Sequence, residues 1–201
     1  MPIIGIVCRY SITEEGNEIN IIYTDIVKSI YKNGGIPIGI SLNSNYKEVI
    51  NMCDGIILEG GDDFVKYEYE AIKYIYEKDI PLLGICLGMQ SMGIVFNGEL
   101  IDIKNHKKRL NYAHSVLVST SSKLYNILKN NIVKVNSRHK SVLKKTDLEI
   151  CAVSQDNYIE AIEDRNKRFF IGIQWHPESM SYDDKQNNIF KYFIKECSKV
   201  K

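Results

Sequence analysis

Short apolar runs alternate with segments of helical periodicity through the first half of the chain, and this alternation constrains the fold more than any other feature. The apolar runs, which are typical of strands buried on both faces, occupy residues 3–7, 36–40, 55–58 and 81–85. Each run is followed by apolar residues at helical spacing, in the segments 19–30, 46–52, 67–78 and 87–96. Strands that alternate with helices of about 10–15 residues favour right-handed crossovers and a parallel sheet.

The second half of the chain has a different pattern. Short β-type runs follow one another with little helix between them, at residues 114–118, 133–135, 149–153, 158–162 and 170–174, and an amphipathic helix follows at about 186–196. We expect these strands to pair partly antiparallel. The prediction is a three-layer α/β domain around a central, mostly parallel (mixed) sheet. The chain has 201 residues, of which 44% are hydrophobic, so we expect one core and one domain spanning residues 1–201.

The composition argues against several classes of partner. The formal net charge of +1 does not indicate a nucleic-acid or membrane surface, and we expect the basic run at 107–109 to be a solvated loop. No apolar run approaches the roughly 18 residues of a membrane span, and the first residues lack the basic leader of a signal peptide. The five cysteines include no Cys-x-x-Cys pair, so we expect no disulfide framework, no zinc or other metal site and no cofactor. A reducing cytoplasm is the expected compartment.

Cys86 is the candidate nucleophile. It lies where a buried strand is expected to turn into a helix, within Gly84-Ile85-Cys86-Leu87-Gly88-Met89-Gln90. Gly84 and Gly88 flank it two residues away on either side, and they let the strand and helix backbones approach closely. The thiol would project at the carboxyl end of the sheet, where open α/β folds bind ligands, and near a helix N-terminus that favours the thiolate. We expect the other four cysteines to be structural.

His176 is the expected base among the four histidines of the chain. It follows the apolar run at 170–173 within Gln174-Trp175-His176-Pro177-Glu178, which places it at a strand end. A cysteine nucleophile needs a histidine that takes its proton and later protonates the leaving amine. Glu178 can accept a hydrogen bond from the far ring nitrogen, which fixes the tautomer and stabilises the imidazolium. Cys86, His176 and Glu178 therefore form the predicted catalytic group.

These two motifs resemble those of the class I glutamine amidotransferase superfamily, and the resemblance covers nearly the whole chain. Residues 84–90 are similar to its nucleophile motif, and residues 175–178 are similar to its His-Pro-Glu motif. Three further segments look closest to the γ-glutamyl-γ-aminobutyrate hydrolase branch, cysteine peptidase family C26: Glu59-Gly60-Gly61-Asp62-Asp63, Val135-Asn136-Ser137-Arg138-His139 and Ile159-Glu160-Ala161-Ile162. The resemblance implies the flavodoxin-like fold of class I glutamine amidotransferases.

The resemblance also implies roles for residues outside the catalytic group. Backbone N–H groups of Gly60, Gly61 and Leu87 would form an oxyanion hole, and glycines after a strand allow the necessary close approach. The side chains that would bind substrate are Gln90, Asn136, Ser137 and His139. His114 and Glu68 match positions of the family's pattern without an assigned role.

The chain departs from the hydrolase branch beside the double glycine. Only residues 62–66 precede the next helix, where the branch has a longer loop, and Val65 replaces an aspartate of its pattern. Leu87 replaces an arginine that is frequent in the branch, and leucine there is usual in amidotransferase domains that serve a synthase. These departures put the identity of the substrate in question. They do not affect the predicted catalytic residues.

Three functions follow from these observations as alternatives. The first is hydrolysis of a small-molecule γ-glutamyl amide through a glutamyl thioester on Cys86, which releases glutamate and an amine. The second is a glutaminase subunit that delivers ammonia to a synthase on another chain. The third is a catalytically silent binding protein on the same fold, which the complete catalytic group argues against. Neither the amine half of the substrate nor the oligomeric state is indicated.

Overall fold

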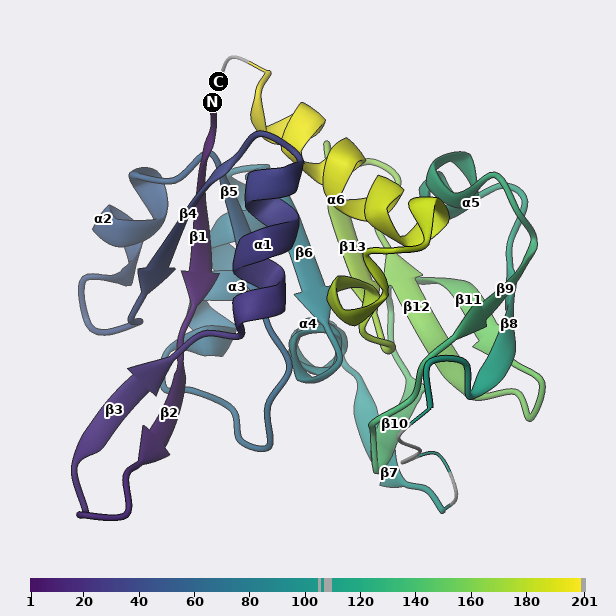
Figure 1. Ribbon diagram of the computed structural model, residues 1–201, viewed down its shortest axis with the longest axis horizontal. Helices are drawn as coiled ribbons and strands as arrows, with labels where there is room; N and C mark the ends of the chain where they lie inside the picture. The colour runs from purple at the N-terminus through teal and green to yellow at the C-terminus, as the bar shows by residue number, and fades with distance from the viewer. Residues whose placement is uncertain (105, 107–109, 200–201) are drawn as a thin grey trace.

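A nine-stranded mixed sheet forms the centre of the computed structural model, which describes residues 1–104, 106 and 110–199 (Figure 1). The strand order is β4 (Ile36–Ile40), β1 (Ile3–Val7), β5 (Gly55–Leu58), β6 (Leu82–Ile85), β13 (Phe170–Ile173), β12 (Ile159–Glu163), β11 (Glu149–Ser154), β8 (His114–Val118) and β9 (Ile132–Val135). The strands from β4 to β13 pair parallel, and those from β13 to β9 pair antiparallel. The basic run at 107–109 lies outside the described residues.

Helices cover both faces of the sheet and make the two outer layers. One face carries α1 (Thr24–Lys32), α5 (Lys123–Leu128) and α6 (Asp184–Cys197), and Figure 1 shows α1 and α6 in front of the strands. The other face carries α2 (Tyr46–Asn51), α3 (Glu68–Glu77) and α4 (Leu87–Val95). Because successive side chains of a strand point to opposite faces, Ile57 of β5 packs in the first core and its neighbours Ile56 and Leu58 pack in the second. The predicted three-layer α/β fold is confirmed.

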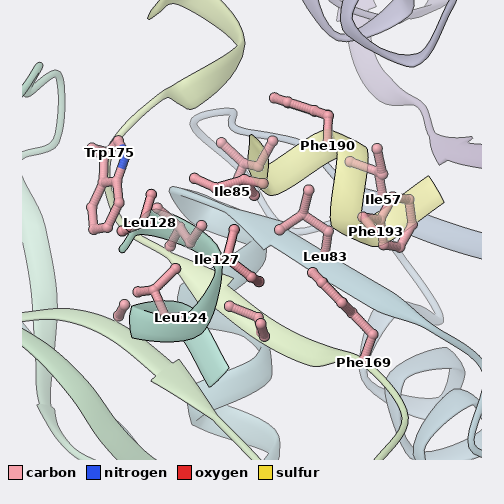
Figure 2. Close-up of a cluster of buried hydrophobic side chains, with 14 of the residues drawn as sticks. Ile57, Leu83, Ile85, Leu124, Ile127, Leu128, Phe169, Trp175, Phe190 and Phe193 are labelled. Atoms are coloured by element: carbon pink, nitrogen blue, oxygen red, sulfur yellow. The ribbon is translucent and has the colours of Figure 1, made fainter. Parts of the chain in front are cut away.

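The core beneath α6 holds the segment that leads to His176. Trp175, Phe190 and Phe193 are fully buried, and Figure 2 shows them in one cluster with side chains of α5, β5 and β6. The indole N–H of Trp175 donates to Oε1 of Gln186 in α6 at 2.9 Å, so its one polar atom is satisfied. Truncation of such a buried aromatic side chain costs about 3–5 kcal/mol. The residue before His176 is therefore firmly anchored.

The first helix is shorter than the apolar spacing predicts. Residues 19–21 belong to β3 (Glu18–Ile21), which pairs antiparallel with β2 (Arg9–Ile12), and α1 begins only at Thr24. The N–H of Thr13 donates to the Asn17 carbonyl at 2.9 Å and closes the hairpin, in which Gly16 adopts a φ of 85°. Pairing with β2 overrides the weak helical preference of this segment. Figure 1 shows the β2–β3 hairpin extending away from the sheet.

Further short elements were not predicted from the sequence. They are β7 (Glu99–Asp102) and β10 (Ser141–Lys145), which pair antiparallel as a second small sheet, the helix α5, and the 3₁₀ helix η1 (Pro177–Met180). Their apolar patterns are too short to indicate an element by periodicity. Within the described residues, no helix has both the length and the apolar character that crossing a membrane requires.

Candidate active site

Three neighbouring parallel strands bring the catalytic candidates to one edge of the sheet. Cys86 directly follows β6, Gly60 lies just beyond β5, and His176 lies just beyond β13. Strands β6 and β13 are in register at Ile85 and Ile173, and the N–H of Cys86 extends the ladder by donating to the Ile173 carbonyl at 2.7 Å. This edge is the carboxyl end of the parallel strands, where open α/β sheets bind ligands.

Cys86 occupies a sharp elbow between β6 and α4. Its φ of 52° and ψ of −105° lie outside the regions that a residue other than glycine normally adopts. A Cβ at Gly88 would lie 2.2 Å from the Leu58 carbonyl oxygen, and one at Gly84 would lie 2.5 Å from Sδ of Met92, so larger residues do not fit at either position. The predicted glycine-flanked elbow is therefore present. Leu87 is the first residue of α4, where backbone N–H groups have no partner within the helix.

His176 lies beside both of the other catalytic candidates. Its Nδ1 donates to Oε1 of Glu178 at 2.7 Å, and Cys86 is near enough to raise the pKa of the ring. Burial lowers the pKa of His176, but the Glu178 carboxylate and the Cys86 sulfur outweigh burial and raise the pKa to about 10. The arrangement therefore favours an imidazolium beside Cys86 at neutral pH.

The double glycine closes the site on the β5 side. A Cβ at Gly60 would lie 2.9 Å from Cε1 of His176 and 3.5 Å from Cβ of Cys86, so glycine lets the backbone contact both. A pocket of about 450 Å³ adjoins Gly60, Gly61 and the three catalytic candidates. The other residues that line it are Tyr23, Thr24, Asp25, Asp62, Arg138 and Ser179. The Cys86 sulfur thus borders a space in which a small substrate can bind.

Comparisons with known proteins show the family of the chain. A family model described as glutamine amidotransferase class-I matches residues 20–196. The chain belongs to this family. It is 32% identical to the glutamine amidotransferase PB2B2.05 of Schizosaccharomyces pombe, over 84% of this chain and 79% of that protein. It is 28% identical to the glutamine amidotransferase-like protein RP404 of Rickettsia prowazekii, over 86% of each.

A solved structure shows the same fold as this glutamine amidotransferase. It is the glutaminase domain of Trypanosoma brucei CTPS with bound acivicin, with a TM-score of 0.77. The two share 21% identity, and the match covers 100% of this chain and 95% of that chain. At this level of identity the likeness concerns the fold.

Gln90 of this amidotransferase is turned away from the pocket that it was expected to line. Its Nε2 donates to the Ser141 carbonyl at 2.8 Å and to Oε1 of Gln174 at 3.1 Å. Gln174 in turn directs its Nε2 toward the Cys86 sulfur at 3.5 Å. Gln90 thus supports a neighbour of the nucleophile in this structure, and its contact with substrate stays a prediction.

The turn after β9 directs Arg138 toward the pocket and three other side chains away from it. Asn136 bonds to the main chain of His176, and Ser137 donates to the carbonyl of His106. His139 is buried, with its Nε2 3.1 Å from Nδ1 of His106, and burial together with nearby histidines lowers its pKa to about 3. Of the four, Arg138 is the one that lines the pocket. The family resemblance did not assign it a role, although it lies within the motif.

A buried ion pair supports the double-glycine turn of this amidotransferase. Nη1 of Arg9 lies 2.6 Å from Oε2 of Glu68, and the same guanidinium donates from Nε to the Glu59 carbonyl at 3.2 Å. Ser91 of α4 donates to the other Glu68 oxygen at 2.5 Å. Glu68 therefore acts through Arg9 on the residue before Gly60. Arg9 is not conspicuous in the sequence because it is far from every motif.

Glu59 is a buried carboxylate close to the catalytic group. Oε2 of Glu59 accepts a hydrogen bond from the N–H of Tyr23 at 2.9 Å, while Oε1 has no partner within the described residues. Burial raises the pKa of Glu59 to about 7, and the negative charge of Glu178 adds to this shift. Glu59 belongs to the motif at 59–63, so the sequence singles it out. Its pKa near 7 could not be predicted, because it results from burial in the folded chain.

Proposed function

We propose that this amidotransferase hydrolyses a γ-glutamyl amide bond through a glutamyl thioester on Cys86. The observation that carries the proposal is the hydrogen bond of His176 to Glu178 at the edge of a pocket that Cys86 also lines. A cysteine next to an oriented histidine is the arrangement that activates a thiol for acyl transfer.

The first half of the reaction forms the thioester. With the Cys86 proton held by His176, the Cys86 thiolate attacks the γ-carbonyl carbon, and the carbonyl oxygen takes up negative charge. Backbone N–H groups of Gly60, Gly61 and Leu87 would stabilise that oxygen. Loss of one such donor typically costs about 10²–10³ in rate. As the C–N bond breaks, the His176 imidazolium gives its proton to the leaving amine and becomes neutral.

The second half releases glutamate. Neutral His176 takes a proton from a water molecule, which attacks the thioester carbon in place of the departed amine. The C–S bond then breaks, glutamate leaves, and Cys86 and His176 return to their starting states. Glu178 holds the ring through both halves and stabilises its charged form.

The charges of the pocket fit the amino-acid end of a glutamyl group. Arg138 supplies a cation that suits an α-carboxylate, while Asp25 and Asp62 supply carboxylates that suit an α-ammonium. We therefore include Arg138 among the substrate-binding candidates, beside the originally predicted Gln90, Asn136, Ser137 and His139.

A second hollow supports a substrate larger than glutamine, such as those of the C26 hydrolase branch. It has a volume of about 540 Å³, lies between the β2–β3 hairpin and residues 61–66, and shares Tyr23, Gly61 and Asp62 with the catalytic pocket. A leaving amine bound there would add binding energy that helps to orient the scissile bond.

The alternative is a glutaminase that passes ammonia to a synthase on another chain. The fold of the CTPS glutaminase domain and Leu87 beside the nucleophile favour it. In that case the β2–β3 hairpin and the hollow beside it would be covered by the synthase.

One substrate panel separates the two functions. Released glutamate would be measured for glutamine, γ-glutamyl-γ-aminobutyrate and γ-glutamyl amides of longer amines, with Cys86→Ala as the inactive control. We expect a γ-glutamyl amide of a sizeable amine to be turned over with the highest kcat/KM. Glutamine as the best substrate, with turnover raised by a co-purifying protein, would replace the hydrolase with the synthase-dependent glutaminase. Retention of activity by Cys86→Ala would refute both.

A further inference from the structure

A buried cluster of histidines and a carboxylate lies apart from the catalytic group. Glu160 of β12 is at its centre, and His114 at the start of β8, His139 in the turn after β9, and His106 surround it. The catalytic proposal gives none of these four side chains a part in bond making or breaking, and His139, which was predicted to bind substrate, does not line the catalytic pocket. Their exposed fractions are 14% for His114, 8% for His106, 1% for His139 and 0% for Glu160, so water does not solvate the cluster freely.

Ligand-type atoms of His106, His114 and Glu160 lie within 4.8 Å of one another, and Nε2 of His139 lies close to two of these three residues. Oε1 of Glu160 lies 2.8 Å from Nε2 of His114, 3.9 Å from Nε2 of His139 and 4.0 Å from Nδ1 of His106. The nitrogens of His106 and His139 are 3.1 Å apart. In a tetrahedral zinc site with bonds of about 2.0–2.1 Å, neighbouring ligand atoms lie roughly 3.3 Å apart. The separations from Glu160 Oε1 and the His106–His139 distance bracket this value, whereas the rings of His114 and His139 lie 6.4 Å apart between centroids and would have to move closer together to enclose an ion.

His106 is already oriented in the way that metal-binding histidines are. Its Nε2 lies 2.8 Å from Oδ2 of Asp156, and a carboxylate can only accept, so Nε2 carries the proton. The lone pair of Nδ1 then points toward His139 and Glu160. A carboxylate that holds the far nitrogen of a ligating histidine is the usual outer partner in zinc sites, where it fixes the tautomer and raises the basicity of the ligand.

Glu160 lacks a compensating cation. It is fully buried, its Oε2 has no hydrogen-bond partner within the described residues, and its ion-pair partners in that part of the chain are histidines. A buried carboxylate without a cation is costly unless it is neutralised or coordinates a metal. A divalent ion would supply the missing positive charge.

We propose that this protein binds one divalent transition-metal ion, with zinc the best fit, through His106, His114, His139 and Glu160, with Asp156 as the outer partner of His106. Imidazole and carboxylate ligands in a tetrahedral arrangement suit zinc. All four positions are taken by side chains, which leaves no place for a reacting water and indicates a structural ion. The ion would tie together β8, β12 and the turn after β9.

The test uses the full chain stripped of metal with EDTA and then titrated with Zn²⁺. We expect one zinc per chain after dialysis, measured by elemental analysis. At about 100 times the dissociation constant, Tm should rise by roughly 5–10 °C. Asp156→Asn, a change at a half-exposed side chain, should weaken zinc binding by about 10–100-fold. His114→Asn and Glu160→Gln should abolish it, with circular dichroism used to verify that each variant folds.

Two controls make the outcome specific. His176→Ala removes a histidine outside the cluster and should leave the zinc stoichiometry at one, and Cys8→Ser removes the most accessible competing thiol and should do the same. Absence of saturable zinc binding, or binding that persists undiminished in Asp156→Asn and His114→Asn, would overturn the proposal and leave the cluster as a hydrogen-bond network. Because stoichiometry and Tm need no substrate, this result does not depend on the catalytic proposal.

Discussion

Asn136 holds His176 by both polar groups of its backbone. Oδ1 of Asn136 accepts a hydrogen bond from the His176 N–H at 2.8 Å, and Nδ2 donates to the His176 carbonyl at 2.8 Å. A side chain therefore continues the hydrogen bonding of β13 beyond the end of the strand. Asn136 is predicted to contact substrate. Its hydrogen bonds indicate a second role, which is to position His176.

The Asn136 clamp predicts a change in kcat with little change in KM. Asn136→Ala should lower kcat by about 10²-fold, because a small displacement of a catalytic group has an effect of this size, while substrate binding in the pocket is retained. Asn131→Ala at the opposite, exposed end of β9 is the matched control and should behave as wild type. Steady-state kinetics measure both. A rise in KM at unchanged kcat would instead assign Asn136 to substrate binding.

Cys86 should be the first cysteine that iodoacetamide alkylates at neutral pH. It borders the pocket beside His176, whereas burial raises the pKa of Cys8, Cys151 and Cys197. Mass spectrometry after short exposure should find the label on Cys86, with loss of activity in step. Equal labelling of several thiols while activity persists would remove Cys86 from the role of nucleophile.

Replacement of His176 and Glu178 should separate proton transfer from orientation. His176→Ala should lower kcat/KM by about 10²–10⁴-fold or more, and Glu178→Gln by less, since the ring remains. Because the Glu178 charge raises the pKa of His176, Glu178→Gln should also move the alkaline limb of the pH–rate profile to lower pH. An unchanged alkaline limb in this variant would show that His176 is not the group titrating there.

Glu59 should make the protein less stable as the pH rises from 5 to 8. The folded chain holds the Glu59 proton more tightly than the unfolded chain, since its pKa is about 7 against 4.5. Its contribution to stability is therefore fully present below about pH 4.5 and is lost as the pH rises through about 7. The shift corresponds to roughly 3 kcal/mol.

Removal of the charge tests this linkage. The free energy of unfolding of Glu59→Gln in urea should fall less between pH 5 and pH 8 than that of wild type. The exposed Glu70→Gln in α3 is the control, and it should follow wild type. Parallel pH profiles for wild type and Glu59→Gln would contradict the assignment.

The hollow beneath the β2–β3 hairpin should set the preference for large amines. Tyr10 lines it with half of its surface exposed, so Tyr10→Ala should lower kcat/KM for a γ-glutamyl amide of a long amine and leave that for glutamine unchanged. Tyr31→Ala, at an exposed tyrosine on α1, serves as the control. Equal losses for both substrates would place Tyr10 outside the leaving-group site.

The parts of the fold that local patterns encode could be predicted, and those that depend on distant pairing could not. The apolar runs at 3–7, 55–58 and 81–85 are strands, because a strand buried on both faces is apolar throughout. The spacing that begins at Ile19 predicts a helix, but pairing with β2 makes its first residues a strand. Register between strands is a tertiary property, which a single segment does not carry.

The candidate catalytic group could be predicted to lie together for the same reason, and the contacts around it could not. Cys86, His176 and Glu178 lie in two compact motifs, each of which shows its chemistry locally. His114 and Glu160 are 46 residues apart in the chain and meet only through the sheet, so cysteine spacing alone predicted no metal site. The side-chain directions at 136–139 also follow from the fold, because the motif does not reveal which residue faces the pocket.

The contact between Gly88 and the Leu58 carbonyl has a consequence for how this protein can diversify. Gly88 of α4 lies so close to the main chain at the end of β5 that a single added methyl group does not fit there. The neighbouring hollow is lined by residues of the β2–β3 hairpin and of 62–66, at the surface of the molecule's active-site edge. A mutational library confined to the lining of this hollow should therefore yield new leaving-group preferences in proteins that still fold, whereas a larger residue at Gly88 should eliminate activity for every substrate at once.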